Sequence, residues 1–189
     1  ILAFVSSGRV GAGACPSSTP FRSSEAFASG IDMPGRSIAD LRGELERAIA
    51  GLSAGPRVVV FGCERCTDVA PVRSADTAAM SLICAGMLPP SFVEYALRSG
   101  ADGVLVTGCA AGACDYRFGQ RWLEDRFAGT REPHLRASVP RQRLRVAWAG
   151  DGSVLELARN LAAFRASLGA RGAPLARPKR GGQVSHAQS

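Results

Sequence analysis

The sequence has few aromatic residues, only two histidines and no long hydrophobic run. Aromatic side chains make up 6% of its 189 residues, and they do not alternate with basic residues as they do in grooves that bind single-stranded nucleic acid. No uninterrupted apolar stretch reaches the roughly 18 residues that a membrane-spanning helix needs. We therefore expect a cytoplasmic protein that binds no nucleic acid and does not span a membrane.

The formal net charge is +7, and part of this excess lies near the C-terminus. Residues 169–189 contain no acidic residue, and their cations are Arg171, Arg177, Lys179 and Arg180. We expect a disordered basic tail here, which aids solubility or docks on an acidic partner. The chain starts at Ile1 rather than at a methionine and shows no secretory signal. This start suggests a piece cut from inside a longer protein.

Hydrophobic periodicity divides the remaining chain into an arm and a domain. Residues 1–36 are rich in Gly, Ser and Pro and have no sustained period, so we expect an irregular arm. Residues 37–168 alternate between helical periods and short β-branched runs. The expected helices are 37–52, 91–99, 118–127 and 154–168, and the expected strands are 57–61, 80–83, 103–107 and 144–148. This alternation predicts an α/β fold, a parallel sheet of about four strands with flanking helices, Rossmann-like or flavodoxin-like.

Local signals mark the ends of some of these elements. Ser37 followed by Asp40 resembles a capping box at the start of the first helix, with Asp in place of Glu. Gly62 is expected to end the first strand, and Gly100 to close the helix before it as a C-terminal cap. These signals place the ends of the elements but carry no chemistry.

Cysteines are the strongest chemical signal in the sequence. Five of the six follow the ends of three predicted strands: Cys63 and Cys66, then Cys84, then Cys109 and Cys114. The carboxyl ends of parallel strands lie at one edge of a sheet, so five thiols are expected to meet there. The chain lacks an export signal and reads as α/β, which favours metal or redox chemistry over a disulfide framework.

Thiolates at one edge suit an iron–sulfur cluster, because its irons prefer soft sulfur ligands in tetrahedral geometry. The loop from Cys63 to Cys66 can supply two ligands. The loop from Cys109 to Cys114 holds only Ala and Gly between its cysteines, so its backbone can fold closely over inorganic sulfide and its amides can donate hydrogen bonds to it. Structural zinc could use the same thiolates, and a thiol–disulfide redox site is a further alternative. We favour the cluster, because this domain has enough strands and helices to fold without zinc.

Other polar residues are weaker candidates for metal binding or catalysis than the cysteines. His134 lies in a predicted loop and His186 in the tail, so neither is expected to bind the metal. We expect the charged residues that flank the cysteines to be solvated or to tune the local charge rather than to act as acids or bases; these are Glu64, Arg65, Asp68 and Asp115.

The sequence around these cysteines resembles the delta (iron–sulfur) subunit family of methyl-viologen-reducing hydrogenases. The resemblance covers about residues 55–168 and is carried by the segments 58–66, 83–86, 92–97, 100–109 and 114–116. It implies a small α/β protein with a [2Fe–2S] cluster, whose candidate ligands are four of the five residues Cys63, Cys66, Cys84, Cys109 and Cys114. It further implies an electron carrier without substrate chemistry of its own. Such a carrier relays electrons between a hydrogenase or dehydrogenase and the A-type redox flavoprotein of heterodisulfide reductase. The alternative is a zinc-stabilised interaction module without redox activity.

This chain departs from the usual family pattern at a few positions. Arg65 stands where the family commonly has an aromatic residue, Thr67 and Asp68 replace a Ser-Tyr pair, and Asp115 replaces a common histidine. We expect these changes to affect the electrostatics of the cluster and the docking surface, while the ligand set is kept.

The sixth cysteine lies in the N-terminal arm. Cys15-Pro16 resembles the end of the bacterial ferredoxin motif C-x2-C-x2-C-x3-C-P. In that register the other three ligand positions are Val5, Gly8 and Gly11, whose side chains cannot bind a metal. The alternatives are a degenerate ferredoxin-like remnant and an accidental resemblance. We favour the remnant and expect the arm to hold no cluster of its own.

Overall fold

The computed structural model describes residues 35–148 and 153–169. The chain divides into two compact units, residues 1–42 and 43–189. Most described residues belong to the second unit, which contains all of the strands that the structure describes. The predictions for Cys15, for most of the arm and for the basic tail lie outside the described residues.

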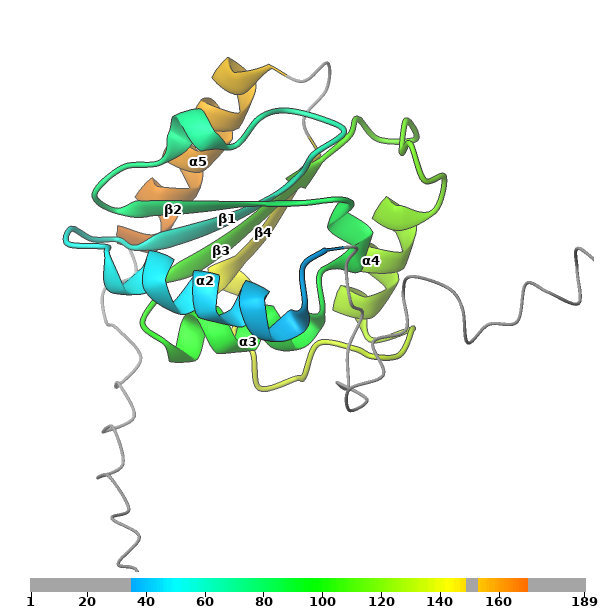
Figure 1. Cartoon of the computed structure of the whole chain (residues 1–189), viewed down its shortest axis with the longest axis horizontal. Coiled ribbons are helices and arrows are strands. Elements are labelled where there is room, and N and C mark those ends of the chain that lie inside the picture. Colours follow the sequence, from blue (N-terminus) through cyan, green and yellow to red (C-terminus); the bar gives the residue numbers. More distant parts are fainter. Residues whose placement is uncertain (1–34, 149–152, 170–189) are drawn as a thin grey trace, which may run out of the picture. The chain divides into compact units, whose positions relative to one another are not determined.

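A four-stranded parallel sheet forms the centre of the second unit (Figure 1). Its strand order is β2-β1-β3-β4, and each pair of neighbours runs parallel. The strands are β1 (Val58–Cys63), β2 (Thr77–Leu82), β3 (Gly103–Gly108) and β4 (Leu144–Trp148). The helices are α2 (Ile38–Ala50), α3 (Pro90–Arg98), α4 (Gly119–Ala128) and α5 (Val154–Gly169), with short 3-10 turns η3 (Ala70–Val72), η4 (Ala85–Met87) and η5 (Arg141–Arg143). The predicted α/β class and parallel sheet are confirmed.

Both faces of the central strands are buried, as the continuous apolar runs predict. All six residues of β1 and all six of β3 are buried. On one face, Val58, Val60 and Leu105 pack in a cluster with residues of α5, which are Leu157, Leu161 and Phe164. Within the part of the chain that the structure describes, no helix is long and apolar enough to cross a membrane.

Two strand boundaries differ from the prediction by more than one residue. β1 continues through Gly62 to Cys63, so Gly62 does not end it. A Cβ atom at position 62 would overlap the side chain of Val69, and glycine is needed there for this close approach. β2 begins at Thr77, three residues before the predicted start. Its first residues are not β-branched and apolar like those of β1, and the parallel register with β1, not local composition, makes them a strand.

The predicted helix caps are present. The amide of Asp40 donates to Ser37 Oγ at 3.1 Å, and the amide of Ser37 donates to Asp40 Oδ2 at 3.1 Å, which is the reciprocal pattern of a capping box. At the end of α3, Gly100 has φ 111°. Its amide donates to Leu97 O and that of Ala101 donates to Ala96 O, which is the Schellman pattern.

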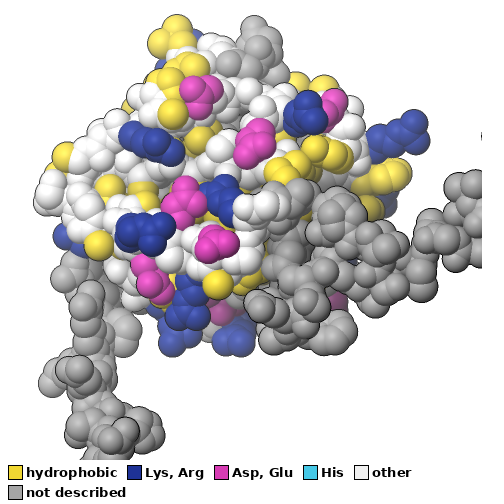
Figure 2. Space-filling model, in the orientation of Figure 1, with side chains coloured by type: hydrophobic (Ala, Val, Ile, Leu, Met, Phe, Trp, Pro, Cys, Tyr) yellow, Lys and Arg dark blue, Asp and Glu magenta, His cyan; other side chains and the backbone are white. Residues whose placement is uncertain are grey.

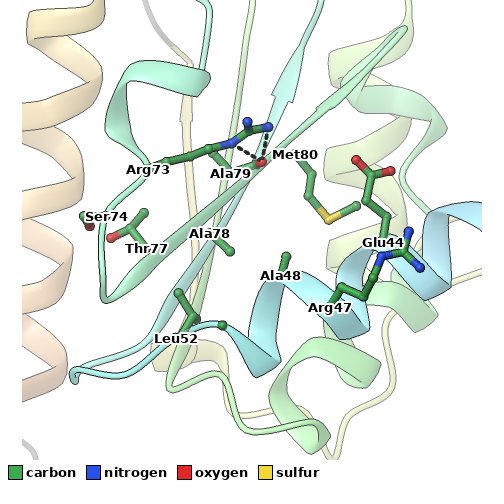
Figure 3. Close-up of a pocket in the computed structure, with 11 residues that line it drawn as sticks. Glu44, Arg47, Ala48, Leu52, Arg73, Ser74, Thr77, Ala78, Ala79 and Met80 are labelled. Atoms are coloured by element: carbon green, nitrogen blue, oxygen red, sulfur yellow. Dashed lines mark hydrogen bonds between the residues drawn. The ribbon is translucent and has the colours of Figure 1, made fainter.

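A groove of about 460 Å³ lies between the last part of α2 and strand β2 (Figure 3). Its lining includes Ala48, Leu52 and Met80. Arg73 donates from Nε and Nη2 to Ala79 O, at 3.1 and 3.0 Å. β2 is an edge strand, and its unpaired carbonyls could accept hydrogen bonds from another strand. The hydrogen bonds from Arg73 use one of these carbonyls, that of Ala79. On the face in Figure 2, basic and acidic side chains are interspersed rather than gathered by sign.

Candidate metal centre

Three connections carry cysteines to the carboxyl edge of the sheet. Cys63 is the last residue of β1, and a turn in which the Cys66 amide donates to Cys63 O at 3.0 Å places Cys66 beside it. Cys84 comes two residues after β2 and opens the turn η4. Cys109 directly follows β3, and Cys114 ends the same loop. The sequence-predicted cysteines therefore follow three adjacent parallel strands, as expected.

The five thiols form one chain of interactions, which we call the cysteine edge. A hydrogen bond with Cys84, together with burial, raises the pKa of Cys63, and the same hydrogen bond lowers the pKa of Cys84. Cys114 also interacts with Cys84. Burial raises the pKa of Cys109, which interacts with Cys63 and Cys66 as well. No disulfide joins these five residues. Cys63 interacts electrostatically with Cys84 and Cys109, Cys84 with Cys114, and Cys109 with Cys66.

Main-chain N–H groups face three of these sulfurs. The amide of Gly86 donates to Cys84 Sγ at 3.4 Å. Such donors place partial positive charge beside the sulfur and favour the thiolate over the thiol. The backbone amides of Arg65 and Ala85 act to lower the pKa of Cys63, and that of Asp115 acts to lower the pKa of Cys109. At Cys63 and Cys109 these amides therefore offset part of the rise in pKa, and at Cys84 the amide adds to its lowering.

Two glycines allow the Cys84 and Cys114 thiols to approach each other. A Cβ on Gly86 would lie 2.6 Å from the Cα of Gly119, so the turn η4 and the start of α4 touch backbone to backbone. A Cβ on Gly119 would lie 2.5 Å from Cys84 Sγ and 3.2 Å from Cys114 Sγ. Both sulfurs thus lie against Gly119, and any side chain at that position would push at least one of them away.

Gln120 holds the Cys109–Cys114 loop, and sequence analysis did not identify it. Its buried side chain donates from Nε2 to Cys109 O and to Ala110 O, the latter at 2.9 Å. Its Oε1 accepts the amide of Gly112 at 3.3 Å. The amide of Ala113 donates to Ala110 O. Two amides of this loop are therefore used within the protein, although we expected its amides to serve inorganic sulfide.

Two of the three charged departures from the family pattern contact each other. Arg65 Nε lies 3.5 Å from Asp115 Oδ2, which joins the loop of Cys66 to the loop of Cys114. Tyr116, and then Asp115, raise the pKa of Arg65. Both partners of the ion pair are largely exposed, and ion pairs in water are weak, so this contact adds little stability. It does fix opposite charges at the outer rim of the cysteine edge.

The remaining candidates lie apart from the thiols. His134 pairs with Glu132 at 2.7 Å on an exposed loop, and His186 lies outside the described residues. Asp68 is exposed and accepts the amide of Ala70, and Glu64 is exposed as well. These flanking carboxylates are solvated, in line with the expectation from the sequence.

An exposed aromatic surface begins two residues after Cys114. Tyr116, Phe118 and Trp122 are each between 39% and 49% exposed. The rings of Phe118 and Trp122 stack with centroids 5.8 Å apart, and the guanidinium of Arg131 lies 4.6 Å from the Trp122 centroid. Sequence analysis did not identify this surface. The i, i+4 spacing of Phe118 and Trp122 at the start of a predicted helix could have indicated it.

The chemistry of the donor set, five thiols after three adjacent strands, fits a thiolate-bound metal. Among residues 35–148 and 153–169, no group of three or more His, Cys, Asp or Glu side chains has the geometry of a metal site. Cys66 Sγ donates to Gly108 O at 3.0 Å, and Cys63 Sγ lies 3.6 Å from Ile83 O. To bind a metal these thiols must lose their protons and turn away from the carbonyls. Five soft donors that follow three adjacent strands suit iron–sulfur chemistry or zinc.

Comparison with known proteins gives one family. The family model described as methyl-viologen-reducing hydrogenase, delta subunit, matches residues 58–172. The D-type iron-sulfur subunit of the F420-non-reducing hydrogenase of Archaeoglobus profundus is 29% identical over 121 residues, which are 60% of this chain and 88% of that protein. The D-type iron-sulfur subunit of the F420-non-reducing hydrogenase vhc of Methanococcus voltae is 29% identical over 119 residues, 56% of this chain and 80% of that protein.

A second kind of relative is much longer than this chain. The A-type subunit of the ferredoxin:CoB-CoM heterodisulfide reductase of Methanosarcina mazei is 32% identical over 117 residues, which are 56% of this chain. The matched region is 14% of that protein, so the similarity concerns one segment of it.

Proposed function

The chain belongs to the delta-subunit family of methyl-viologen-reducing hydrogenases, and from this premise we propose that it is an electron-transfer subunit. In this proposal four of the five thiols of the cysteine edge hold one [2Fe–2S] cluster. The observation that carries it is the placement of five electrostatically interacting thiols after three adjacent parallel strands, with a main-chain amide donating to Cys84 Sγ. When bound, such a cluster accepts and returns one electron.

The protein's own part is to hold the sulfurs and set their electrostatic environment. Gly119 leaves room for Cys84 and Cys114, and Gln120 fixes the loop that carries Cys109 and Cys114. The amides at Cys63, Cys84 and Cys109 offset negative charge, which increases when an electron arrives. Hydrogen bonds to sulfur and burial both tune the reduction potential of such centres. No substrate bond is made or broken by these residues.

We further propose the partners that the resemblance implies. Electrons would pass between a hydrogenase or dehydrogenase and an A-type redox flavoprotein of heterodisulfide reductase. Two relatives are named as iron-sulfur subunits of hydrogenases. A segment similar to this chain also occurs within a protein named as part of a heterodisulfide reductase, which supports close association of the two parts. The cytoplasmic location expected from the sequence stays a prediction.

The exposed aromatic surface is the docking site that fits this role best. Tyr116, Phe118 and Trp122 follow Cys114 within eight residues, so a partner bound there lies close to the thiols. Exposed aromatic side chains and arginines such as Arg131 are enriched where proteins bind one another. We assign this surface to the redox partner.

Anaerobic purification tests the proposed cofactor. The full chain, reconstituted with iron and sulfide, is expected to absorb visible light, to bleach with dithionite and to give a spin-half EPR signal after one-electron reduction. The variant Cys15→Ser is the matched control, since it removes a cysteine outside the cysteine edge and is expected to keep the signal. A colourless protein that retains stoichiometric zinc under the same treatment would instead support the zinc-stabilised interaction module.

A further inference from the structure

Arg126 is a buried charge that the proposed function has not used. It lies on α4 with 7% of its surface exposed. Its Nη1 donates to Gly86 O at 2.7 Å, whereas its Nε is buried without a hydrogen-bond partner. In the part of the chain that the structure describes, no carboxylate forms an ion pair with it.

Such an arrangement is costly for the protein without its cofactor. Burying a cation without a counter-charge opposes folding, and burial lowers the pKa of Arg126, with the nearby charge of Arg131 acting in the same direction. An arginine nevertheless stays charged in a protein. Its neighbours on α4, Leu123 and Phe127, are buried and apolar. An apolar side chain at position 126 would therefore suit the surroundings better than a guanidinium does.

The contact of Arg126 identifies the negative charge that would balance it. Its guanidinium binds the carbonyl of Gly86, and the amide of the same Gly86 donates to Cys84 Sγ. Gly86 also touches Gly119, against which both Cys84 Sγ and Cys114 Sγ lie. The guanidinium is thus linked to Cys84 Sγ through the single residue Gly86. No hydrogen-bonded carboxylate stands between them among the described residues.

We propose that Arg126 is the buried counter-charge of the cysteine edge. When four thiols each release a proton to solvent and bind a divalent metal, the product carries a net charge of about −2, which a buried cation stabilises. This part of the proposal requires only that the thiols bind a metal. A second part rests on the proposed function: a fixed positive charge favours the reduced cluster, because reduction adds one negative charge, and so it raises the reduction potential.

Cadmium binding to the metal-free full chain tests the first part. Cd²⁺ affinity is measured by chelator competition, with the ultraviolet absorption of the cadmium–thiolate bond as the signal. Arg126→Gln keeps a hydrogen-bond donor and removes the charge, and we expect affinity to fall about tenfold, or about 1.4 kcal/mol. Arg126→Lys keeps the charge and is expected to stay within about threefold of wild type. Arg98→Gln, which removes one exposed charge from α3, is the control and should leave the affinity unchanged.

The reduction potential of the cluster-loaded chain tests the second part. An EPR-monitored redox titration of Arg126→Gln is expected to show a tenfold loss in the equilibrium constant for reduction, which is about 59 mV for one electron. Arg126→Lys is expected to restore the wild-type potential. A merely structural role predicts otherwise: urea unfolding of the metal-free variants would show both substitutions destabilising the fold, with potential and Cd²⁺ affinity unchanged. That result would overturn the proposal.

Two further outcomes are informative. If Arg126→Gln does not fold, Arg126→Met fills the same space with an apolar chain, and its Cd²⁺ affinity takes the place of the first measurement with the same expected tenfold loss. If wild type binds Cd²⁺ in an Arg126-dependent way but never takes up an iron–sulfur cluster, the electron-transfer function fails and the counter-charge stands.

Discussion

The cysteine edge and the groove beside β2 belong to the same sheet but are built in opposite ways. The groove is a hollow of about 460 Å³, and small side chains such as Ala48 and Ala78 leave its space open. At the cysteine edge, by contrast, Gly86 and Gly119 bring two segments of backbone into contact. The side chain of Gln120 forms hydrogen bonds with the backbone of the Cys109–Cys114 loop. The chemistry that we propose therefore lies where the chain is closely packed, away from the open groove.

The largest expected effect comes from replacing a proposed cluster ligand at the cysteine edge, compared with replacing a polar residue in the groove. Cys63→Ser and Cys109→Ser place hard oxygen where soft sulfur contacts other thiols, and each should abolish the EPR signal or shift its potential strongly. Ser74→Ala in the groove should leave the signal unchanged, since the Ser74 hydroxyl donates to Asp76 within its own turn. Wild-type spectra from both cysteine variants would show that the ligand set is wrong.

A glycine in each region gives the next comparison. In Gly119→Ala the new methyl group would meet Cys84 Sγ at 2.5 Å, and we expect a loss of about 1–3 kcal/mol in unfolding free energy together with lower cluster occupancy. In Gly51→Ala, at the groove, the nearest atoms lie at 3.6 Å, and stability should change by less than about 0.5 kcal/mol. Urea unfolding and iron analysis measure both effects. Equal losses of stability and iron content in the two variants would contradict the proposed difference in packing between the two regions.

Side-chain hydrogen bonds provide a third comparison. Gln120→Leu leaves the buried carbonyl of Cys109 without its partner and should cost about 1–3 kcal/mol in urea unfolding. Arg73→Leu frees only the edge-strand carbonyl of Ala79, which water can reach once the guanidinium is gone, and should cost about 0.5–1.5 kcal/mol. A Gln120 variant as stable as wild type would mean that the loop holds its shape without this side chain.

The smallest expected effect is a pH dependence of the metal-free protein. The pKa values of Cys63 and Cys109 are raised, so the folded state keeps protons that the unfolded state releases at high pH. Their stabilisation is present below the pKa of an unfolded cysteine, about 8.5, and is lost as pH rises above it. The lowered pKa of Cys84 acts in the opposite direction, and it does so below about pH 8.5, where its contribution to stability rises with pH. Urea unfolding between about pH 8.5 and 10 should therefore show a modest decline, which Cys63→Ala reduces.

Much of the fold could be predicted because its signals are local. The β-branched run of β1 and the Ser37–Asp40 cap are readable from a few neighbouring residues, and both are present. The start of β2 could not be predicted, because Thr77 and Ala78 become strand residues only through their pairing with β1. The role of Gly62 was misjudged for a similar reason, since Val69 packs against it from beyond the strand.

The candidate site, too, could be predicted only in part. That five cysteines follow three strands could be predicted from their spacing, because parallel strands share one carboxyl edge. The contacts of Gln120 with the loop at Cys109 and of Arg126 with Gly86 could not, because glutamine and arginine on a helix are usually solvated. Only the folded backbone places these side chains against the segments that carry the thiols.

Iron and acid-labile sulfide analysis of the anaerobically reconstituted full chain tests the central claim most directly. A single [2Fe–2S] cluster on the cysteine edge predicts about two irons and about two sulfides per chain, with one spin-half EPR species after reduction. It also predicts that the arm, with Val5, Gly8 and Gly11 at the ferredoxin positions, adds none. A value near six irons, with a second EPR species of [4Fe–4S] type, would contradict the reading of the arm. Stoichiometric zinc without iron or sulfide would contradict the account as a whole.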